Sequence, residues 1–301
     1  MINSMEEMIQ KAKNKETQSV VVPGAAGEEV LKAVKKAKNE NIINPILVGN
    51  ETAIRELTSE IGLNLEKDRI IAAENTSEIC QKSVSMLAEG KADVLMKGLV
   101  DTSRLMKEVL KKEYNLRTER LISHLVLAEV PAVDRLLFIS DGGMNIKPSL
   151  EEKASIIQNA IDAAQKLGWE QPKAAVLAAV EKTKEAMPET MDAAVLSKMA
   201  ERGQITGGLV EGPYALDNAL SSEAAEIKGL SGPVAGEADI LITPDISSGN
   251  LLGKSVIHMA GGRFAALLGG TRKPIVVTSR ADSAEVRFIS LAASGVMALT
   301  E

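Results

Sequence analysis

Short apolar runs alternate with longer helical segments along most of this 301-residue sequence, and this alternation constrains the fold more than any other feature. An apolar run that stops at a polar turn is typical of a buried parallel strand, and the helical segment after it is typical of a crossover to the next strand. The sequence therefore predicts an α/β protein with mostly parallel sheets. The predicted strands lie at residues 19–22, 45–49, 69–72, 93–96, 174–179, 205–210, 240–242 and 275–278.

Two apolar runs in the middle of the chain depart from this alternation. Residues 121–130 and 135–140 are separated by a loop of four residues, which is too short for a crossover helix. We expect these runs to pair antiparallel or to pass between sheets. Because 301 residues also exceed the usual size of one hydrophobic core, we expect two domains, with a boundary near Ser140.

The composition argues against several classes of protein. A formal net charge of −6 disfavours a general nucleic-acid binder, which needs a basic face. Cys80 is alone, so no internal disulfide forms, and this favours a reducing cytoplasm. No apolar run is long enough to span a membrane, and residues 1–15 lack the apolar core of a signal peptide. We therefore expect a cytoplasmic protein with no membrane or nucleic-acid partner.

Residues 238–264 carry the clearest local sign of a binding site. The predicted strand 240–242 stops at a Thr-Pro-Asp sequence, and a helix is predicted to begin near Asn250. A strand, a polar turn and a helix N-terminus in this order present free backbone N–H groups to an anion. Gly249 lies in the turn, and Lys254, one turn inside the helix, adds a positive charge. Most turns of this kind in α/β proteins bind nothing, which is the alternative interpretation.

Polar residues gather at five predicted strand ends. The carboxyl ends of parallel strands lie on one edge of a sheet, so clusters far apart in sequence are expected to converge there. They supply cations, hydroxyls, carboxylates and backbone N–H groups, which suit phosphate binding and acyl or phosphoryl transfer. The clusters are Lys97-Gly98 with residues 101–104, residues 141–143, residues 211–213, residues 245–250, and Ser279-Arg280 with Asp282.

Most of these clusters also have an ordinary structural explanation. Lys97 and Gly98 fit a solvated loop, and Arg104 fits an ion pair with Glu108, four residues on in the same helix. Residues 141–143, Asp-Gly-Gly, are more typical of a turn than of a ligand loop.

The last cluster is the sharpest, because a cap does not explain its arginine. Asp282 or Ser283 fits the cap of the final helix, predicted over residues 283–299. Arg280 at the end of a β-branched strand is better placed to clamp a phosphate with its two-pronged guanidinium.

The sequence gives little support to metal or common nucleotide chemistry. His124 lies in a predicted strand and His258 in a predicted helix, so a His-based metal site or a Ser-His triad is disfavoured. Neither G-x-G-x-x-G after a first strand nor G-x-x-x-x-G-K-[ST] is present, which argues against a simple Rossmann dehydrogenase and a P-loop enzyme.

Several of these segments together resemble the phosphate acetyl/butyryltransferase family. The sequences RTERLISH (117–124) and EGPYALDNA (211–219) are more similar to the butyryl branch than to the acetyl branch. The segments with the resemblance span most of residues 90 to 290, in the family's order and spacing. They are residues 139–168, 209–221, 234–262 and 274–287.

The resemblance implies a fold and an activity. The fold is similar to that of isocitrate and isopropylmalate dehydrogenases, with a cleft between a first domain, residues 1–139 plus 281–301, and a second, residues 140–280. The activity is reversible exchange of coenzyme A and phosphate on an acyl group, from butyryl-CoA and phosphate to butyryl phosphate and CoA. Acyl-CoA and phosphate are substrates, and no cofactor or metal is implied. Family members associate as dimers or larger homo-oligomers.

The resemblance also implies roles for single residues. Ser279 and Arg280 match a Ser-Arg pair in which the serine stabilises the tetrahedral state and the arginine holds phosphate. Arg104, in Asp-Thr-Ser-Arg, matches a family arginine. Asn250 and Lys254 match the loop and helix that line the cleft.

We take Lys97, Gly98 and Gly249 as further candidates for substrate binding. The acetyl branch has a carboxylate seven residues after the serine, where this sequence has Val286. Either Asp282 or Glu285 substitutes for that base, or no base is needed.

Three alternatives stay open from the sequence. The first is an acyltransferase of the same kind that prefers acetyl or propionyl groups. A decarboxylating dehydrogenase of the related fold needs a carboxylate cluster for a divalent metal, which we do not find in the sequence. A catalytically silent CoA- or acyl-phosphate-binding module is the alternative outside enzymes, and the presence of Ser279 and Arg280 argues against it.

Overall fold

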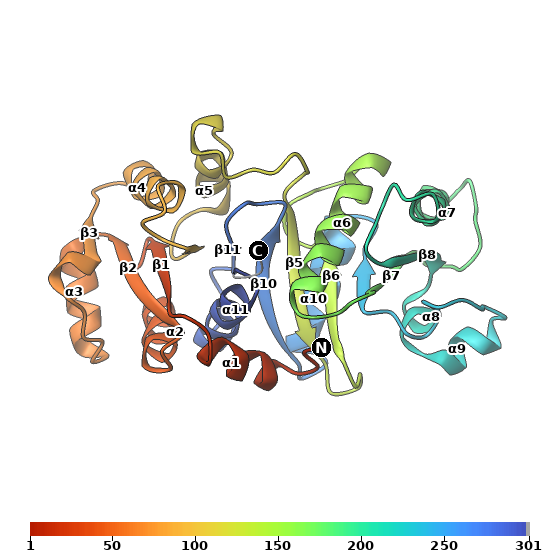
Figure 1. The fold of residues 1–301 in the computed structure, drawn as a ribbon, viewed down its shortest axis with the longest axis horizontal. Coiled ribbons are helices and arrows are strands. Elements are labelled where there is room, and N and C mark those ends of the chain that lie inside the picture. Colours follow the sequence, from red (N-terminus) through yellow and green to blue (C-terminus); the bar gives the residue numbers. More distant parts are fainter. Residues whose placement is uncertain (299–301) are drawn as a thin grey trace. The chain divides into compact units, whose positions relative to one another are not determined.

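The structure, a computed structural model, describes residues 1–298 and shows two compact units. The middle unit consists of Met1–Met5 and Arg120–Phe264, and the terminal unit consists of Glu6–Glu119 and the chain from Ala265 onward. Each unit is a mixed α/β body (Figure 1). No helix among residues 1–298 is long and apolar enough to cross a membrane.

The strands of the terminal unit follow the order β3-β2-β1-β4-β11-β10. All neighbouring pairs in it are parallel except β10 with β11. Its strands are β1 (Gln18–Pro23), β2 (Ile43–Gly49), β3 (Ile70–Ala72), β4 (Val94–Met96), β10 (Arg263–Gly269) and β11 (Ile275–Val276). Its helices are α1 (Met5–Lys13), α2 (Glu28–Asn39), α3 (Glu51–Glu60), α4 (Thr76–Ala88), α5 (Thr102–Val109) and α11 (Ala284–Met297), with 3-10 turns at Lys67–Arg69 and Lys112–Tyr114.

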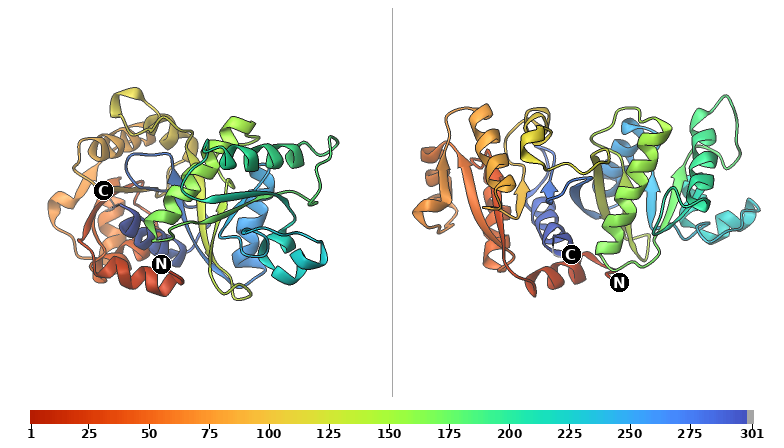
Figure 2. Two further views of the ribbon diagram at one scale, coloured as in Figure 1. Left: turned by 45° about the vertical axis from the view of Figure 1, so that its right-hand side comes forward. Right: turned by 45° about the horizontal axis from the view of Figure 1, so that its top comes forward.

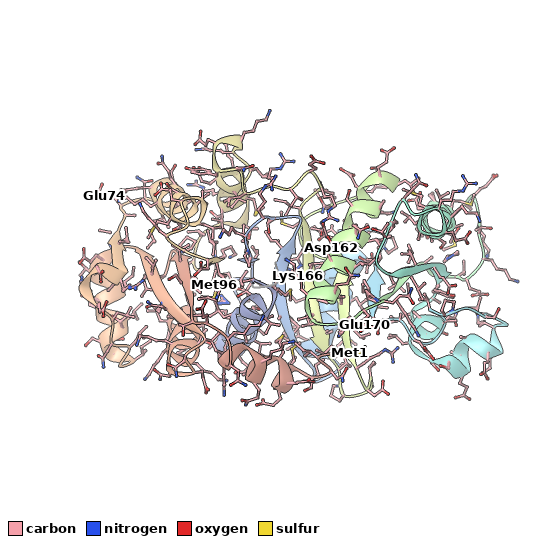
Figure 3. All side chains as sticks on the ribbon, viewed as in Figure 1. Met1, Glu74, Met96, Asp162, Lys166 and Glu170 are labelled. Carbon is pink, nitrogen blue, oxygen red and sulfur yellow. The ribbon has the colours of Figure 1, made fainter. Side chains whose placement is uncertain are left out.

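Helices cover both faces of this sheet. Helices α2 and α11 pack against each other on one face, and α4 crosses β1, β2 and β4 on the other (Figure 1). The buried side of α2 is aliphatic, and α11 is buried from Val286 to Met297 by mainly apolar residues. Strand β4 ends at Met96, which is fully buried (Figure 3). The polar loop that follows therefore starts at the edge of a packed core.

The strands of the middle unit follow the order β5-β6-β9-β7-β8. The pair β5 and β6 is antiparallel, as one of the two alternatives predicted, and the other pairs are parallel. Its strands are β5 (Ser123–Glu129), β6 (Leu136–Ser140), β7 (Lys173–Leu177), β8 (Leu209–Tyr214) and β9 (Ile240–Ile242). Its helices are α6 (Leu150–Lys166), α7 (Pro188–Glu201), α8 (Leu216–Leu220), α9 (Ser222–Ile227) and α10 (Ile246–His258).

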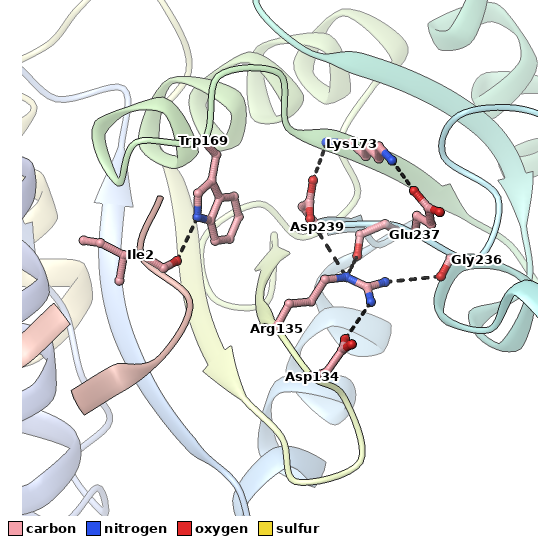
Figure 4. Close-up of polar contacts among 9 residues, drawn as sticks. Ile2, Asp134, Arg135, Trp169, Lys173, Gly236, Glu237 and Asp239 are labelled. Carbon is pink, nitrogen blue, oxygen red and sulfur yellow. Dashed lines mark hydrogen bonds and ion pairs between the residues drawn. The ribbon is translucent and has the colours of Figure 1, made fainter. Parts of the chain in front are cut away.

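Helices α6 and α10 lie on opposite faces of this sheet (Figure 2). A capping box starts α6, in which the Ser149 hydroxyl accepts from the Glu152 N–H and the Glu152 carboxylate accepts from the Ser149 N–H. Phe138 of β6 meets Trp169 edge to face, with ring centroids 5.6 Å apart. The indole N–H donates to the Ile2 carbonyl at 3.0 Å, which fixes the first residues of the chain to this unit (Figure 4).

A half-buried polar cluster aligns the starting ends of three strands in the middle unit (Figure 4). The Arg135 guanidinium donates to the carbonyls of Ala238 and Gly236 at 3.1 and 3.3 Å. The Asp239 carboxylate accepts from the Lys173 backbone N–H at 2.9 Å. Burial raises the pKa of Asp239 above its ordinary value, because the charged form loses solvation. These bonds fix the register of β6, β9 and β7 at the end opposite the candidate site.

The observed units differ from the expected domains, 1–139 plus 281–301 and 140–280. Strand β5 pairs with β6, and β6 pairs with β9, so residues 120–139 belong with the middle unit. Strand β11 pairs with β4, so residues 275–280 belong with the terminal unit. As a consequence, Ser279 and Arg280 lie in the same unit as Lys97 and Arg104.

Two local predictions were wrong at their boundaries. Helix α10 begins at Ile246 rather than near Asn250, because Asp245 and Ser248 form a capping box ahead of it. Strand β8 begins at 209 rather than 205, because the Thr206 N–H donates to a glutamine side chain on α6 instead of a neighbouring strand. Strand β10 was not predicted at all. The expected end of the last helix, Leu299, lies outside the described residues, and α11 ends at Met297.

Two glycines four residues apart in α10 should respond oppositely to alanine. A Cβ at Gly249 meets the Asp141 carbonyl oxygen at 2.3 Å, whereas a Cβ at Gly253 meets nothing closer than 3.9 Å. We expect Gly249→Ala to lower the free energy of unfolding by about 2 kcal/mol through overpacking. Gly253→Ala should raise it by up to about 1 kcal/mol through helix propensity. Urea denaturation of both variants measures this, and equal effects would contradict the close approach at Gly249.

Candidate active site

The parallel pairing of β4 with β11 brings two of the predicted clusters together in the terminal unit. Met96 pairs with Val276, and the Lys97 N–H donates to the Val276 carbonyl at 2.9 Å. Both strands end at this point, so the Lys97-Gly98 loop and the Ser279-Arg280 turn leave the sheet side by side. The expected convergence at the carboxyl ends of the strands is confirmed within this unit.

Gly98 allows a close approach that no other residue permits. Its N–H donates to the Pro23 carbonyl at 3.0 Å, and a Cβ at this position would lie 2.4 Å from the Gly24 carbonyl oxygen. The next N–H, of Leu99, donates to the Gly24 carbonyl at 2.7 Å. The loop after β4 is therefore fixed to the loop after β1.

Lys97 is buried, so the solvated-loop interpretation was wrong. Its side chain is 3% exposed, and its ammonium donates to the carbonyls of Gly98 and Val100, both at 3.3 Å. Burial lowers the pKa of Lys97 below its ordinary value, and the positive charges of Arg287 and Arg280 lower it further. Lys97 thus supplies positive charge from beneath the site.

Asp101 gathers two exposed arginines above the buried lysine. Its carboxylate accepts from the Arg280 guanidinium at 2.9 Å and lies 3.9 Å from Nε of Arg104. The expected pairing of Arg104 with Glu108 was wrong, because Glu108 accepts from Lys111 at 2.8 Å and from a tyrosine hydroxyl instead. The side chains of Arg280 and Arg104 are 70% and 64% exposed, so both are accessible to a ligand.

Ser279 lies at the start of a tight turn that a carboxylate holds. The Asp282 N–H donates to the Ser279 carbonyl at 3.2 Å, and the Ser279 N–H donates to the Asp282 carboxylate at 2.7 Å. Ser283, and not Asp282, caps helix α11, since its hydroxyl accepts from the Val286 N–H. Ser279 itself is exposed. Asp282 therefore serves to shape the turn that presents the serine.

Glu285, the second candidate base, forms an ion pair away from the Ser279 turn. Its carboxylate forms an ion pair with Lys36 of α2 at 2.7 Å. The Lys36 ammonium also lies 4.0 Å from the ring centroid of Phe288. Among the contacts of the described residues, none joins Glu285 to Ser279 or Arg280. The structure thus brings Ser279, Arg280 and Asp282 together and leaves Glu285 outside this group.

Sequence reasoning missed Arg287, which lies directly under the turn. It is fully buried, and its guanidinium donates to the carbonyls of Ser279, Arg280 and Asp282 at 3.0, 3.4 and 3.1 Å. A fourth bond reaches the Thr278 hydroxyl at 3.2 Å. The available signal was an arginine near the start of the largely apolar helix 284–297.

The charges around the turn favour an anion. Burial lowers the pKa of Arg287 below its ordinary value, while the nearby Asp282 and Glu29 carboxylates act to raise it. Two buried cations and two exposed arginines thus lie near three carboxylates, Asp101, Asp282 and Glu29. Such an excess of positive charge raises the local concentration of phosphate and other anions.

The middle unit holds the second candidate cluster, at the ends of β6 and β9. Gly142 and Gly249 are so close that a Cβ on Gly142 would lie 2.7 Å from the Gly249 backbone. The Asn250 side-chain amide donates to the Gly142 carbonyl at 3.0 Å. Gly249 and Asn250 lie in the first turn of α10, and Lys254 lies two turns in rather than one. Lys254 is half-buried, with its ammonium 5.8 Å from the ring centroid of Phe264.

A buried carboxylate holds the glycine loop of this second cluster. Asp141 is 2% exposed and accepts from the N–H groups of Gly143 and Met144 at 2.8 and 2.9 Å. Its other oxygen accepts from the His124 N–H at 3.0 Å and from the Asn145 amide at 2.6 Å. The turn interpretation of residues 141–143 therefore describes their observed structure.

One other predicted cluster, at Glu211, has a structural role. Glu211 lies inside β8, where it accepts from the Tyr214 hydroxyl at 2.9 Å and from the Val234 N–H at 3.1 Å. Within residues 1–298, no group of three or more His, Cys, Asp or Glu side chains is arranged to hold a metal ion.

Comparison with known proteins agrees with this geometry. Residues 4–82 and 70–293 match the phosphate acetyl/butaryl transferase family. The chain is 43% identical to a phosphate butyryltransferase of Clostridium acetobutylicum, over 99% of each chain. It is 41% identical to a phosphate acetyltransferase of Thermotoga maritima, over 98% of this chain and 99% of that one.

A solved structure shows the same fold. The branched-chain phosphotransacylase of Enterococcus faecalis V583 aligns with a TM-score of 0.83 and 33% identity, covering 95% of this chain and 100% of that one. These matches span nearly the whole sequence, including both candidate clusters. The chain therefore belongs to the phosphate acetyl/butaryl transferase family.

Proposed function

We propose that this protein exchanges coenzyme A and phosphate on a short-chain acyl group, converting butyryl-CoA and phosphate reversibly to butyryl phosphate and CoA. One observation carries the proposal: Ser279 and two exposed arginines lie above two buried cations at the joint end of β4 and β11. The relatives named phosphate butyryltransferase and branched-chain phosphotransacylase support it.

The reaction needs positive charge at two places. A phosphate oxygen attacks the thioester carbonyl carbon and forms a C–O bond, while the carbonyl electron pair moves to its oxygen. When that oxyanion collapses, the C–S bond breaks and CoA leaves as thiolate, which takes up the proton that the phosphate loses. Arg280 and Arg104 are placed to hold the phosphate, and the Ser279 hydroxyl is placed to donate to the oxyanion.

The contacts of the candidate bases support a mechanism in which positive charge, rather than a carboxylate base, stabilises the thiolate. Asp282 is bound to the Ser279 N–H, Glu285 pairs with Lys36, and Val286 stands where the acetyl branch has its carboxylate. A thiol has an ordinary pKa near 8.5, and nearby positive charge stabilises its thiolate. Lys97 and Arg287 supply that charge from below, so we propose that no carboxylate base is required.

The acyl chain length is the finer part of the proposal. A phosphate acetyltransferase is about as similar to this chain as a phosphate butyryltransferase is, so an acetyl-preferring enzyme is the second candidate. The proposal also includes an isocitrate dehydrogenase-like fold with a cleft between domains, assembly as a homo-oligomer, a cytoplasmic location and independence of cofactors. Asn250, Lys254 and Gly249 are its proposed substrate-binding residues in the middle unit.

The proposed activity predicts phosphate-dependent release of CoA. With straight-chain and branched acyl-CoAs of two to six carbons in metal-free buffer, we expect thiol release to be strongest at four carbons. The same reactions without phosphate are the control. Strongest release at two carbons would favour the acetyltransferase, and no release from any thioester would favour the silent binding module.

Arg280→Ala should separate catalysis from folding. The exposed ion pair with Asp101 contributes about 1 kcal/mol or less to stability, so the melting temperature should stay near that of the wild type. We expect kcat/KM to fall by about 100-fold or more, because a charged donor to the transferring phosphate is lost. Arg55→Ala, which removes an exposed arginine paired with Glu51 on α3, is the matched control. Near-normal kcat/KM in the Arg280 variant would contradict the assignment.

Lys97→Met should change how stability depends on pH. Because the pKa of Lys97 is lowered on folding, the unfolded chain binds more protons between that lowered pKa and the ordinary value near 10.4. Wild-type stability therefore gains from this group as pH rises through that window. We expect the free energy of unfolding of Lys97→Met, relative to that of the wild type, to be highest below this pH window and to decline through it. Lys107→Met is the control. Chemical denaturation at several pH values measures it, and a rising difference would contradict the burial of a charged lysine.

A further inference from the structure

We infer that Arg287 is a positioning residue that turns the backbone N–H groups of Arg280 and Ala281 outward, where they form an anion-binding pair beside the Ser279 hydroxyl. The proposed ligand of this pair is the carbonyl oxygen of the acyl group as it becomes an oxyanion. The inference rests on the proposed function and adds the donors for that charge.

The direction of these N–H groups follows from the carbonyls that Arg287 holds. Its guanidinium donates to the Ser279 carbonyl at 3.0 Å and to the Arg280 carbonyl at 3.4 Å. In a trans peptide unit the C=O and the following N–H point in opposite directions. The cis peptide bonds of residues 1–298 lie elsewhere, at 140–141 and 212–213. The N–H groups of Arg280 and Ala281 therefore point away from Arg287.

Solvent lies on that side of the turn. Ser279, Arg280 and Ala281 are exposed, whereas Arg287 is fully buried. The other N–H groups of the turn are already used, since that of Ser279 donates to the Asp282 carboxylate and that of Asp282 donates to the Ser279 carbonyl. No hydrogen bond of the described chain takes up the two outward groups. A pair of backbone donors next to a serine hydroxyl is the arrangement that stabilises tetrahedral oxyanions in acyl transfer.

The energetics of Arg287 favour this role over a structural one. The hydrogen bonds of the buried guanidinium go to carbonyls and a hydroxyl, and burial still lowers its pKa although the Asp282 and Glu29 carboxylates lie nearby. Its Nε is buried without a hydrogen-bond partner. An apolar side chain in α11 would fill the same space without these costs. The guanidinium also places positive charge under the donors, which strengthens their attraction for an anion.

The test compares the kinetics of Arg287→Met, Arg287→Lys and Ser290→Ala with acyl-CoA and phosphate. For Arg287→Met we expect kcat to fall by about 100-fold or more, with KM for acyl-CoA within about threefold of the wild type. Arg287→Lys keeps the charge but not the planar fork, so we expect it to recover stability and less than about a tenth of kcat.

Ser290→Ala is the matched control for lost stability. Ser290 is fully buried in the same helix, and its hydroxyl accepts from the Ala266 N–H at 2.9 Å, away from the turn. We expect this variant to melt at a lower temperature and to keep the wild-type kcat at 25 °C. A loss of kcat that merely follows the loss of stability across the variants would overturn the inference.

A backbone substitution tests the donors without touching Arg287. Replacing Ala281 by lactic acid changes its amide to an ester and removes that one N–H. We expect kcat to fall by about tenfold or more while the melting temperature stays within a few degrees of the wild type. A wild-type kcat in this variant or in Arg287→Met would overturn this inference and leave the proposed function intact. Failure of the wild type to release CoA from any acyl-CoA would instead reject the proposed function, and the inference with it.

Discussion

The candidate site of the terminal unit depends on one pairing, that of β11 with β4. Ile275 pairs with Leu95, so two strands about 180 residues apart in sequence run in parallel and end together. The loop after one strand supplies Lys97, and the turn after the other supplies Ser279 and Arg280. Parallel pairing is what places both polar segments on one edge of the sheet, because an antiparallel β11 would direct its turn to the opposite edge.

Two buried cations beneath this edge are costly for the fold. Lys97 and Arg287 are held mainly by carbonyl groups, and burial lowers the pKa of each. A protein under selection for stability alone has little reason to bury two positive charges whose hydrogen bonds go mainly to carbonyls. Their position beneath two exposed arginines and a serine makes sense if the ligand brings the negative charge. The phosphate and the developing oxyanion of acyl transfer are such ligands.

The carboxylates nearby organise the backbone and the arginines of the site. Asp282 holds the N–H of Ser279, and Asp101 brings the arginines of two different segments to one place. In the middle unit, Asp141 likewise accepts from the N–H groups of Gly143 and Met144 and from the Asn145 amide, besides the His124 N–H. With Val286 at the position of the acetyl-branch base, positive charge is the remaining means to stabilise a thiolate.

The sequence by itself determined the features that depend on local pattern. Strand β9 has the predicted bounds, 240–242, and β5 and β6 pair antiparallel, because apolar runs, turn residues and a short loop specify them within a few residues. The prediction that Ser279 and Arg280 belong to the site also came from the residues of one local segment. Tertiary structure alone decided that Arg104 turns to Asp101 and not to Glu108, and that Glu285 pairs with Lys36. It also decided that Arg287 lies under the Ser279 turn, because burial and the choice among charged partners depend on segments that meet only when the sheet forms.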